Sequence, residues 1–240
     1  MGAFSLIEQR RYRDFCTLYE QQHSQPEPQN PDPDLAPGNY ILALLAAEQY
    51  PELEQACLRE LERLEQIRRT ALAPYRGLSL GYFRQGRWEQ AAQALRQGAA
   101  AKYQDQSRTA AGCLLYYQAA AQQNQALLRE SRRMLASRLR GKEADAALAA
   151  AYFLLDRCGE QELLQLAGSE QNPVLRRRRL VQAQFYLGVK HLEQGRQAEY
   201  LTAMRQAAAQ YESCPAVVLE YEFHQAEWIL KQHAAQQNTP

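Results

Sequence analysis

Helix-forming segments in this chain are interrupted at a nearly constant interval, and this recurrence limits the fold more than any other feature. The interruptions lie just before Tyr12, Tyr50 and Trp88 and at Gln123-Asn124, Cys158-Gly159 and Gly195-Arg196. The three aromatic residues are 38 positions apart, and the later breaks follow at about 36 or 37 residues. A fixed period of this length is typical of stacked helical repeats. The sequence therefore predicts an array of about six helix hairpins.

The stretch LSLGYFRQGRWEQAAQAL, from Leu78 to Leu95, shows how one interval should fold. Apolar or small residues recur at helical spacing on both halves, at Leu78, Tyr82, Ala91 and Leu95. Gly86 lies between the halves and can adopt the positive φ of a tight turn. We expect two antiparallel helices that pack through these stripes.

The composition agrees with an all-α chain. Hydrophobic residues make up 46% of the sequence and charged residues 23%, which is enough apolar material for a packed core. Ala, Leu, Gln, Glu and Arg dominate, whereas β-branched residues are sparse. Because the net charge is only +1, no overall field attracts nucleic acid or an anionic membrane.

Cysteine usage and apolar runs bear on the location of the protein. The five cysteines are odd in number and far apart, so a disulfide framework is not expected and a reducing cytoplasm fits better. The start of the chain has no apolar core of signal-peptide length, and no run elsewhere approaches about 18 apolar residues. We expect a cytoplasmic chain with no membrane span.

Residues 72–102 resemble a tetratricopeptide repeat. The matching positions are Tyr75, Leu78, Tyr82, Gly86, Trp88, Ala91, Leu95 and Ala99, although Ser79 replaces the usual glycine and the closing proline is absent. Residues 181–211 match at Leu187, Gly188, Gly195, Met204 and Ala207, with Tyr200 in a slot normally given to a small alanine. Elsewhere only the period is kept. The resemblance implies a right-handed α-solenoid whose first helices line a concave, protein-binding face.

These patterns divide the chain into four segments. Residues 1–22 are expected to form an N-terminal helix or partial hairpin, and residues 23–39, which contain five prolines, an exposed loop. Residues 40–235 form the repeat array, and residues 236–240 a tail. The last part of the array starts at Pro215 and is expected to be a capping helix for the open end of the solenoid.

No pattern typical of an enzyme is present. The four histidines show no metal-ligand spacing, and His191 is interpreted as a packed helix residue. There is no GxSxG elbow and no phosphate-binding loop. The five cysteines are interpreted as buried small side chains. We expect no catalytic residue, metal or cofactor; an active site assembled from residues distant in sequence remains a third hypothesis.

Two arginine clusters favour an alternative function. Arg176–Arg179 occupy a full helical turn, so one or two of them should pack their stems or pair with acids while the others reach solvent. Together with Arg129–Lys142 they could form a strip that binds an acidic protein or RNA phosphates. A solvated, salt-bridged helix face is favoured because the overall charge is balanced. An RNA-binding or regulatory α-solenoid is therefore the alternative.

The concave face implied by the repeat family supplies nine candidate partner-binding residues. The two matching units give Arg76, Phe83, Arg84, Phe185, Val189 and Leu192, and the period alone adds Tyr117, Phe153 and Arg157. With Tyr82 and Trp88 in the hairpin core, Phe83 and Arg84 would face the partner. Arginines beside aromatic residues are typical of protein-binding grooves. We expect a non-enzymatic module that binds a protein or peptide rather than nucleic acid. A toxin-neutralising immunity protein and a secretion chaperone are both compatible with it, and the oligomeric state stays open.

Overall fold

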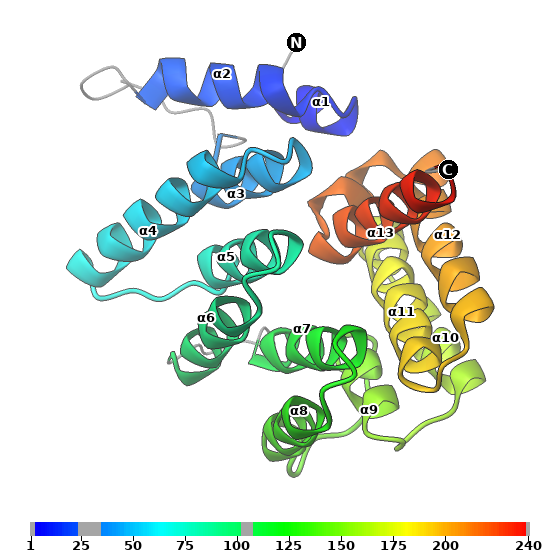
Figure 1. The fold of residues 1–240 in the computed structure, drawn as a ribbon. Coiled ribbons are helices and arrows are strands. Elements are labelled where there is room, and N and C mark those ends of the chain that lie inside the picture. Colours follow the sequence, from blue (N-terminus) through cyan, green and yellow to red (C-terminus); the bar gives the residue numbers. More distant parts are fainter. Residues whose placement is uncertain (1–2, 24–34, 102–107, 239–240) are drawn as a thin grey trace. The chain divides into compact units, whose positions relative to one another are not determined.

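The computed structural model describes residues 3–23, 35–101 and 108–238, and all of its regular elements are helices (Figure 1). Within these ranges there are thirteen α-helices, one 3-10 helix and no strand, so the all-α prediction is confirmed. Among the described helices, none combines the length and the hydropathy that a membrane span requires. The chain divides into two compact units, residues 1–103 and 104–240.

The first unit is built from consecutive helices. In chain order they are α1 (Ala3–Glu8), α2 (Tyr12–His23), α3 (Pro37–Ala46), α4 (Tyr50–Gln66), α5 (Ala73–Arg84) and α6 (Trp88–Ala100). Because α3 packs against α2, α4 and α5, six consecutive residues from Tyr40 to Leu45 are buried. The proline-rich loop expected over 23–39 falls largely on residues 24–34, which lie outside the described part of the chain.

The second unit has an interior shared by helices that are far apart in sequence. Its elements are α7 (Arg108–Ala121), α8 (Gln125–Arg138), α9 (Ala149–Leu154), α10 (Glu160–Gly168), α11 (Pro173–Glu193), α12 (Gln197–Ser213), the 3-10 helix η1 (Pro215–Leu219) and α13 (Tyr221–Gln237). Since α9 has only six residues, α11 packs against α7 as well as α9. On α13, Gln225 Nε2 donates a 2.7 Å hydrogen bond to the Tyr117 hydroxyl of α7.

Seven helix ends share one turn geometry: one follows α4, at Arg68 with φ 53°, and the other six join α1 to α2, α3 to α4, α5 to α6, α7 to α8, α9 to α10 and α11 to α12. Each of these six contains one residue with φ between 52° and 74°: Arg10, Glu48, Gly86, Gln123, Asp156 and Gly195. In each turn the N–H of the following residue donates to the carbonyl five residues earlier, for example Arg87 to Tyr82 at 2.9 Å. This is the Schellman helix end, in which a left-handed residue reverses the chain. The helices on either side of each turn pack against each other.

The turn between α9 and α10 lies earlier than the sequence indicated. Its left-handed residue is Asp156, whereas the predicted break was Cys158-Gly159. Gly159 instead has an extended backbone, with φ −84° and ψ 174°, and precedes α10 as its N-cap. Because glycine also serves at helix starts, its presence did not mark the position of the turn.

The segment after Pro215 is not one continuous helix. Pro215 opens the 3-10 helix η1, and α13 begins at Tyr221 and continues to Gln237, two residues past the predicted end of the array. Between them lies Glu220, which is 4% exposed and accepts hydrogen bonds from Arg178 and Gln182. A buried carboxylate needs such donors, and Arg178 and Gln182 supply them.

Candidate functional site

Five of the nine residues expected on the concave face are buried. They are Phe83, Tyr117, Phe153, Phe185 and Val189, none of which is more than 5% exposed. In the second unit, Tyr117 and Phe185 meet edge to face with ring centroids 5.2 Å apart, and Gln225 binds the Tyr117 hydroxyl. These side chains fill the interior of their own unit, so they offer a partner almost no contact area.

The expected orientation of Phe83 and Trp88 is reversed. Phe83 is 4% exposed and lies edge-on to Trp88, with the ring centroids 5.0 Å apart, while Trp88 itself is 46% exposed. A helix buried on several sides leaves little of its surface to solvent, and α5 is buried at seven of its twelve positions. Phe83 therefore belongs to the core of the first unit.

The other four candidates retain exposed surface, two of them in each unit. Arg76, Arg84 and Leu192 are half-buried, and Arg157 is exposed with its guanidinium 5.9 Å from the centroid of the Tyr152 ring. Arg84 Nη1 donates a 2.9 Å hydrogen bond to the Leu45 carbonyl in the last turn of α3. Since the last carbonyls of a helix lack intrahelical partners, Arg84 has a structural role at that helix end.

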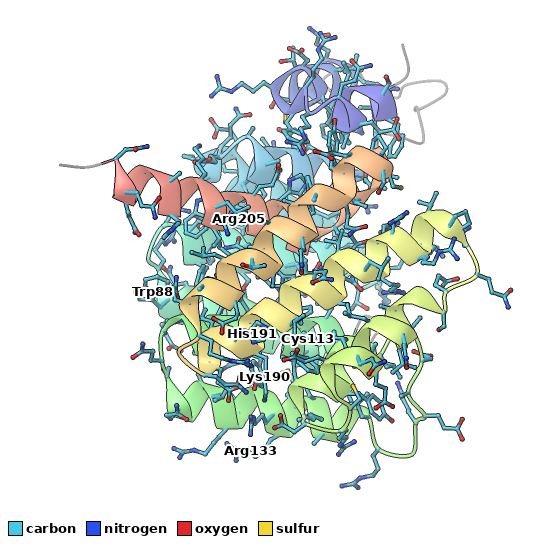
Figure 2. All side chains as sticks on the ribbon, turned by 90° about the vertical axis from the view of Figure 1, so that its right-hand side faces the viewer. Trp88, Cys113, Arg133, Lys190, His191 and Arg205 are labelled. Atoms are coloured by element: carbon cyan, nitrogen blue, oxygen red, sulfur yellow. The ribbon has the colours of Figure 1, made fainter. Side chains whose placement is uncertain are left out.

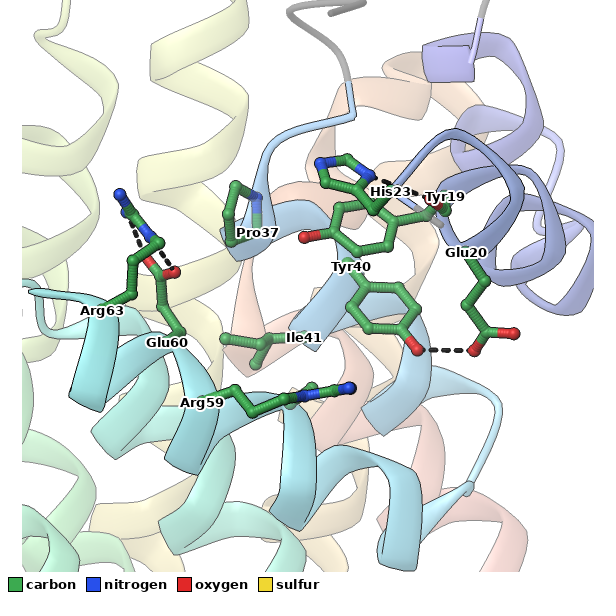
Figure 3. Close-up of a pocket in the computed structure, with 10 residues that line it drawn as sticks. Tyr19, Glu20, His23, Pro37, Tyr40, Ile41, Arg59, Glu60 and Arg63 are labelled. Carbon is green, nitrogen blue, oxygen red and sulfur yellow. Dashed lines mark hydrogen bonds and ion pairs between the residues drawn. The ribbon is translucent and has the colours of Figure 1, made fainter. Parts of the chain in front are cut away.

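The first unit contains a pocket of about 660 Å³ where α2, α3 and α4 surround an open space (Figure 3). Its lining residues are Tyr19, Glu20, His23, Pro37, Tyr40, Ile41, Ala56, Arg59, Glu60 and Arg63. We call this the α2–α4 pocket. Its size falls within the range of ligand-binding pockets, about 300–1,000 Å³.

Three stacked rings form one wall of the α2–α4 pocket. Tyr40 and Tyr19 lie with centroids 4.0 Å apart at an interplanar angle of 5°, and Tyr19 and His23 follow at 3.9 Å and 17°. The Tyr40 hydroxyl donates a 2.6 Å hydrogen bond to Glu20 Oε1; burial and this bond raise the pKa of Tyr40. The stack thus runs from the buried Tyr40, whose hydroxyl is bound to Glu20, to the exposed His23.

The opposite wall carries the charges. Arg63 donates two 2.7 Å hydrogen bonds to Glu60, which raise the pKa of Arg63. Arg59 is exposed and makes no hydrogen bond or ion pair within the described residues. Burial and the Glu60 charge raise the pKa of Tyr19, while Arg59 acts in the opposite direction. Stacked rings facing an unpaired guanidinium can hold a group with an apolar or planar body and a carboxylate.

Residues that line this pocket could be recognised in the sequence, but they do not lie at the groove positions of the repeat family. Tyr19 and His23 are four residues apart on α2, where side chains share one face. Tyr19 fell in the segment interpreted as an N-terminal helix or partial hairpin, and His23 in the segment interpreted as an exposed loop. Tyr40 and Arg59 lie in a repeat that keeps the period but little of the family motif.

A compact ionic cluster in the second unit surrounds the Tyr116 hydroxyl. This hydroxyl donates to Glu193 Oε2 at 2.5 Å and accepts from Lys190 Nζ at 3.0 Å and Arg132 Nη2 at 3.2 Å. Asp156 completes the set, 2.8 Å from Lys190 Nζ and 3.3 Å from Arg132 Nη2. The charges of the two cations and the two carboxylates balance. The contacts of the cluster link α7, α8 and α11 to the turn between α9 and α10.

Residues with potential for chemistry are otherwise packed or dispersed. His191 is buried on α11, as interpreted from the sequence. Cys16, Cys57 and Cys113 are buried, and burial is the largest cause of the raised pKa values of Cys16 and Cys57. Cys158 and Cys214 are half-buried, so the expectation that all five are buried is wrong for these two. In the described part of the chain, no three histidine, cysteine or acidic side chains are grouped to hold a metal ion.

The arginine run on α11 is partly paired, as its helical spacing requires. Arg178 pairs with Glu220, and Arg179 Nη1 donates to Gln182 Oε1 at 3.0 Å. Arg176 and Arg177 are exposed, and Arg177 Nη1 donates to Gln210 at 3.2 Å. The expectation of one or two paired arginines with the others in solvent is confirmed.

Comparison with known proteins identifies no relative. No protein-family model matches the sequence, and no curated protein matches it. Support for a function therefore comes from the geometry of the described residues and from the sequence pattern.

Proposed function

We propose that this chain is a non-enzymatic binding module of the tetratricopeptide type. The proposed architecture is a right-handed α-solenoid of six antiparallel helix hairpins, with α13 as the cap. Support comes from six turns that share one Schellman geometry and from the packing of the helices on either side of each turn. The repeat-like residues between Tyr75 and Ala99 and between Leu187 and Ala207 add to this support.

We propose that the α2–α4 pocket binds the protein or peptide partner. The observation that carries this proposal is the stack of His23, Tyr19 and Tyr40 facing the unpaired Arg59. Aromatic residues and arginine are the residue types that contribute most binding energy at protein interfaces. Rings that are already stacked lose little conformational entropy on binding, so the pocket is preorganised.

The biological role that we propose is capture of one partner in the cytoplasm. A toxin-neutralising immunity protein and a secretion chaperone remain the two candidate roles. A toxin gene next to the gene of this chain would favour immunity, and a secreted substrate would favour chaperoning. RNA binding through exposed arginines is the alternative, and it requires affinity to fall steeply with salt.

The test is capture of the partner by the full chain and by two variants with the same charge change. Arg59→Glu reverses the charge in the pocket, and Arg13→Glu reverses an exposed, unpaired arginine outside it. Both residues are exposed, so neither substitution should unfold the protein. We expect the wild type and Arg13→Glu to retain the same protein from a lysate of the native host, and Arg59→Glu to lose it. Equal retention by Arg59→Glu and Arg13→Glu would exclude the pocket, and recovery of RNA in place of protein would favour the alternative.

A further inference from the structure

The helix α8 concentrates positive charge in a chain that is almost neutral overall. Between Arg129 and Lys142 there are six basic residues and one acidic residue, whereas the net charge of the chain is +1. Arg132 is committed to the ionic cluster around Tyr116. Four others, namely Arg129, Arg133, Arg140 and Lys142, are exposed.

Arg129 and Arg133 form a like-charge pair on the outer face of α8. They are four residues apart, so their side chains are neighbours on the helix surface. Neither side chain has a hydrogen bond or an ion pair with any described residue. Figure 2 shows Arg133 on the outer side of α8, directed away from the rest of the unit. Like charges at this spacing destabilise a helix, so the pair gives the fold no advantage.

The two remaining cations have a structural explanation that Arg129 and Arg133 lack. Arg140 and Lys142 follow the C-terminal end of α8, where positive charge interacts favourably with the helix dipole. Arg129 and Arg133 lie further inside the helix, and the dipole effect is confined to the last turn. On α11, by contrast, Arg178 and Arg179 have partners. The fold therefore accounts for neither Arg129 nor Arg133.

We infer that the outer face of α8 is a docking surface for an acidic segment of a protein partner. This inference rests on the proposed protein-binding function and names the chemistry of the partner. A helix or extended segment with carboxylates at matching spacing would pair with Arg129 and Arg133. Arginine forms planar, two-pronged hydrogen bonds with carboxylates, which adds specificity to charge attraction.

Two observations favour an acidic protein over nucleic acid on this face. The helix α8, QALLRESRRMLASR, has no aromatic side chain on which bases could stack. The chain as a whole has a sequence pI of about 7.6, well below the pI above 9 that is typical of nucleic-acid-binding domains.

The test measures binding of a labelled, alanine-rich peptide that carries glutamates four residues apart. Fluorescence anisotropy at about 20 mM salt gives the affinity, because screening is weak at low ionic strength. Arg129→Gln/Arg133→Gln removes the pair, and Arg13→Gln/Arg205→Gln removes two other exposed, unpaired arginines as a control of equal charge. A single-stranded RNA of equal charge is the competing probe.

We expect the α8 double variant to weaken peptide binding about tenfold and the control variant less than twofold, since two exposed pairs together supply about one factor of ten. The thermal stability of the α8 variant should be unchanged or raised because a repulsive pair is removed. Equal weakening by both variants, absence of peptide binding by the wild type, or tighter binding of RNA through the same arginines would each overturn the inference. Arg59→Glu, which tests the α2–α4 pocket, should leave peptide binding unchanged, so failure here is distinguishable from failure of the proposed function.

Discussion

The shared geometry of the six turns predicts opposite effects for two substitutions in the second unit. Gly195 has φ +73°, and an added Cβ would meet nothing within 4 Å, so Gly195→Ala changes only the conformational preference. The left-handed conformation costs a non-glycine residue about 1–2 kcal/mol, and reduced freedom of the unfolded chain offsets about 0.4–1 kcal/mol of this. Gly195→Ala should therefore destabilise the unit by about 1 kcal/mol.

The reverse substitution tests the same reasoning at a turn without glycine. Gln123 has φ 52°, and its side chain is exposed. Gln123→Gly relieves the left-handed strain and makes the unfolded chain more flexible, so we expect a net stabilisation of about 0.5–1 kcal/mol. Both positions belong to the second unit, so both substitutions should move the same unfolding transition.

Gly168→Ala is the matched control for these two substitutions. Gly168 ends α10 without a left-handed φ, and an added Cβ would meet nothing within 4 Å. Alanine should be neutral or stabilise this position by up to about 1 kcal/mol. Urea denaturation followed by circular dichroism at several protein concentrations gives the free energies, since 1 kcal/mol shifts the midpoint by about 0.5 M at a typical slope. If Gly195→Ala behaves like Gly168→Ala, or if Gln123→Gly destabilises the unit, the left-handed strain does not govern these turns.

Three further substitutions test the packing and electrostatics of the second unit. Tyr116→Phe removes the hydroxyl shared by three charged groups and should cost about 1–3 kcal/mol in urea denaturation; an unchanged midpoint would contradict the ionic cluster. Burial, and next the charge of Arg196, lower the pKa of His191 below 6.5, so the unfolded chain binds this proton more readily. Stability should therefore fall as the pH drops below about 6.5, and His191→Gln should flatten that dependence. Gly188→Val should destabilise by about 1–3 kcal/mol because even a Cβ there would lie 2.5 Å from Met204 Cε and 3.2 Å from a backbone oxygen; native-like stability would show that α11 and α12 can move apart.

The period of the breaks was readable from the sequence because helix-forming segments and turn residues differ in composition. Gly86 and Gly195 also revealed the left-handed residue itself. Arg10, Glu48 and Gln123 did not, since a left-handed conformation in these residues depends on the hydrogen bonds of the helix end and not on the side chain. Composition thus located the turns to within a few residues but identified their geometry only at the glycines.

The candidate site was less predictable because it depends on contacts between distant segments. Groove positions taken from a repeat family assume that each unit touches only its neighbours. In the second unit, however, Gln225 binds Tyr117 across 108 residues of sequence, and the inner face becomes core. No periodic pattern encodes such a contact. The α2–α4 pocket was missed for a related reason, since its rings come from two helices that the proline-rich segment separates.

The structure shows that the tyrosines of this chain have different roles. The chain has 14 tyrosines and 6 phenylalanines, an excess that suggests binding surfaces. Four tyrosine hydroxyls nevertheless donate to a glutamate on another helix, in the pairs Tyr40–Glu20, Tyr82–Glu54, Tyr116–Glu193 and Tyr186–Glu222. A tyrosine bound in this way contributes to stability, so an abundance of tyrosine does not by itself indicate a binding surface.

Tyr19 differs from these four because its hydroxyl has no hydrogen bond within the described residues and is directed into the α2–α4 pocket in Figure 3. Tyr19→Phe should therefore leave the urea midpoint unchanged and weaken capture of the partner, since only a bound ligand uses the hydroxyl. Tyr82→Phe is the matched control: it removes the 2.8 Å bond to Glu54, and should lower stability by about 1–2 kcal/mol without affecting capture. If Tyr19→Phe instead lowers stability as Tyr82→Phe does, the Tyr19 hydroxyl is structural and is not available to a partner.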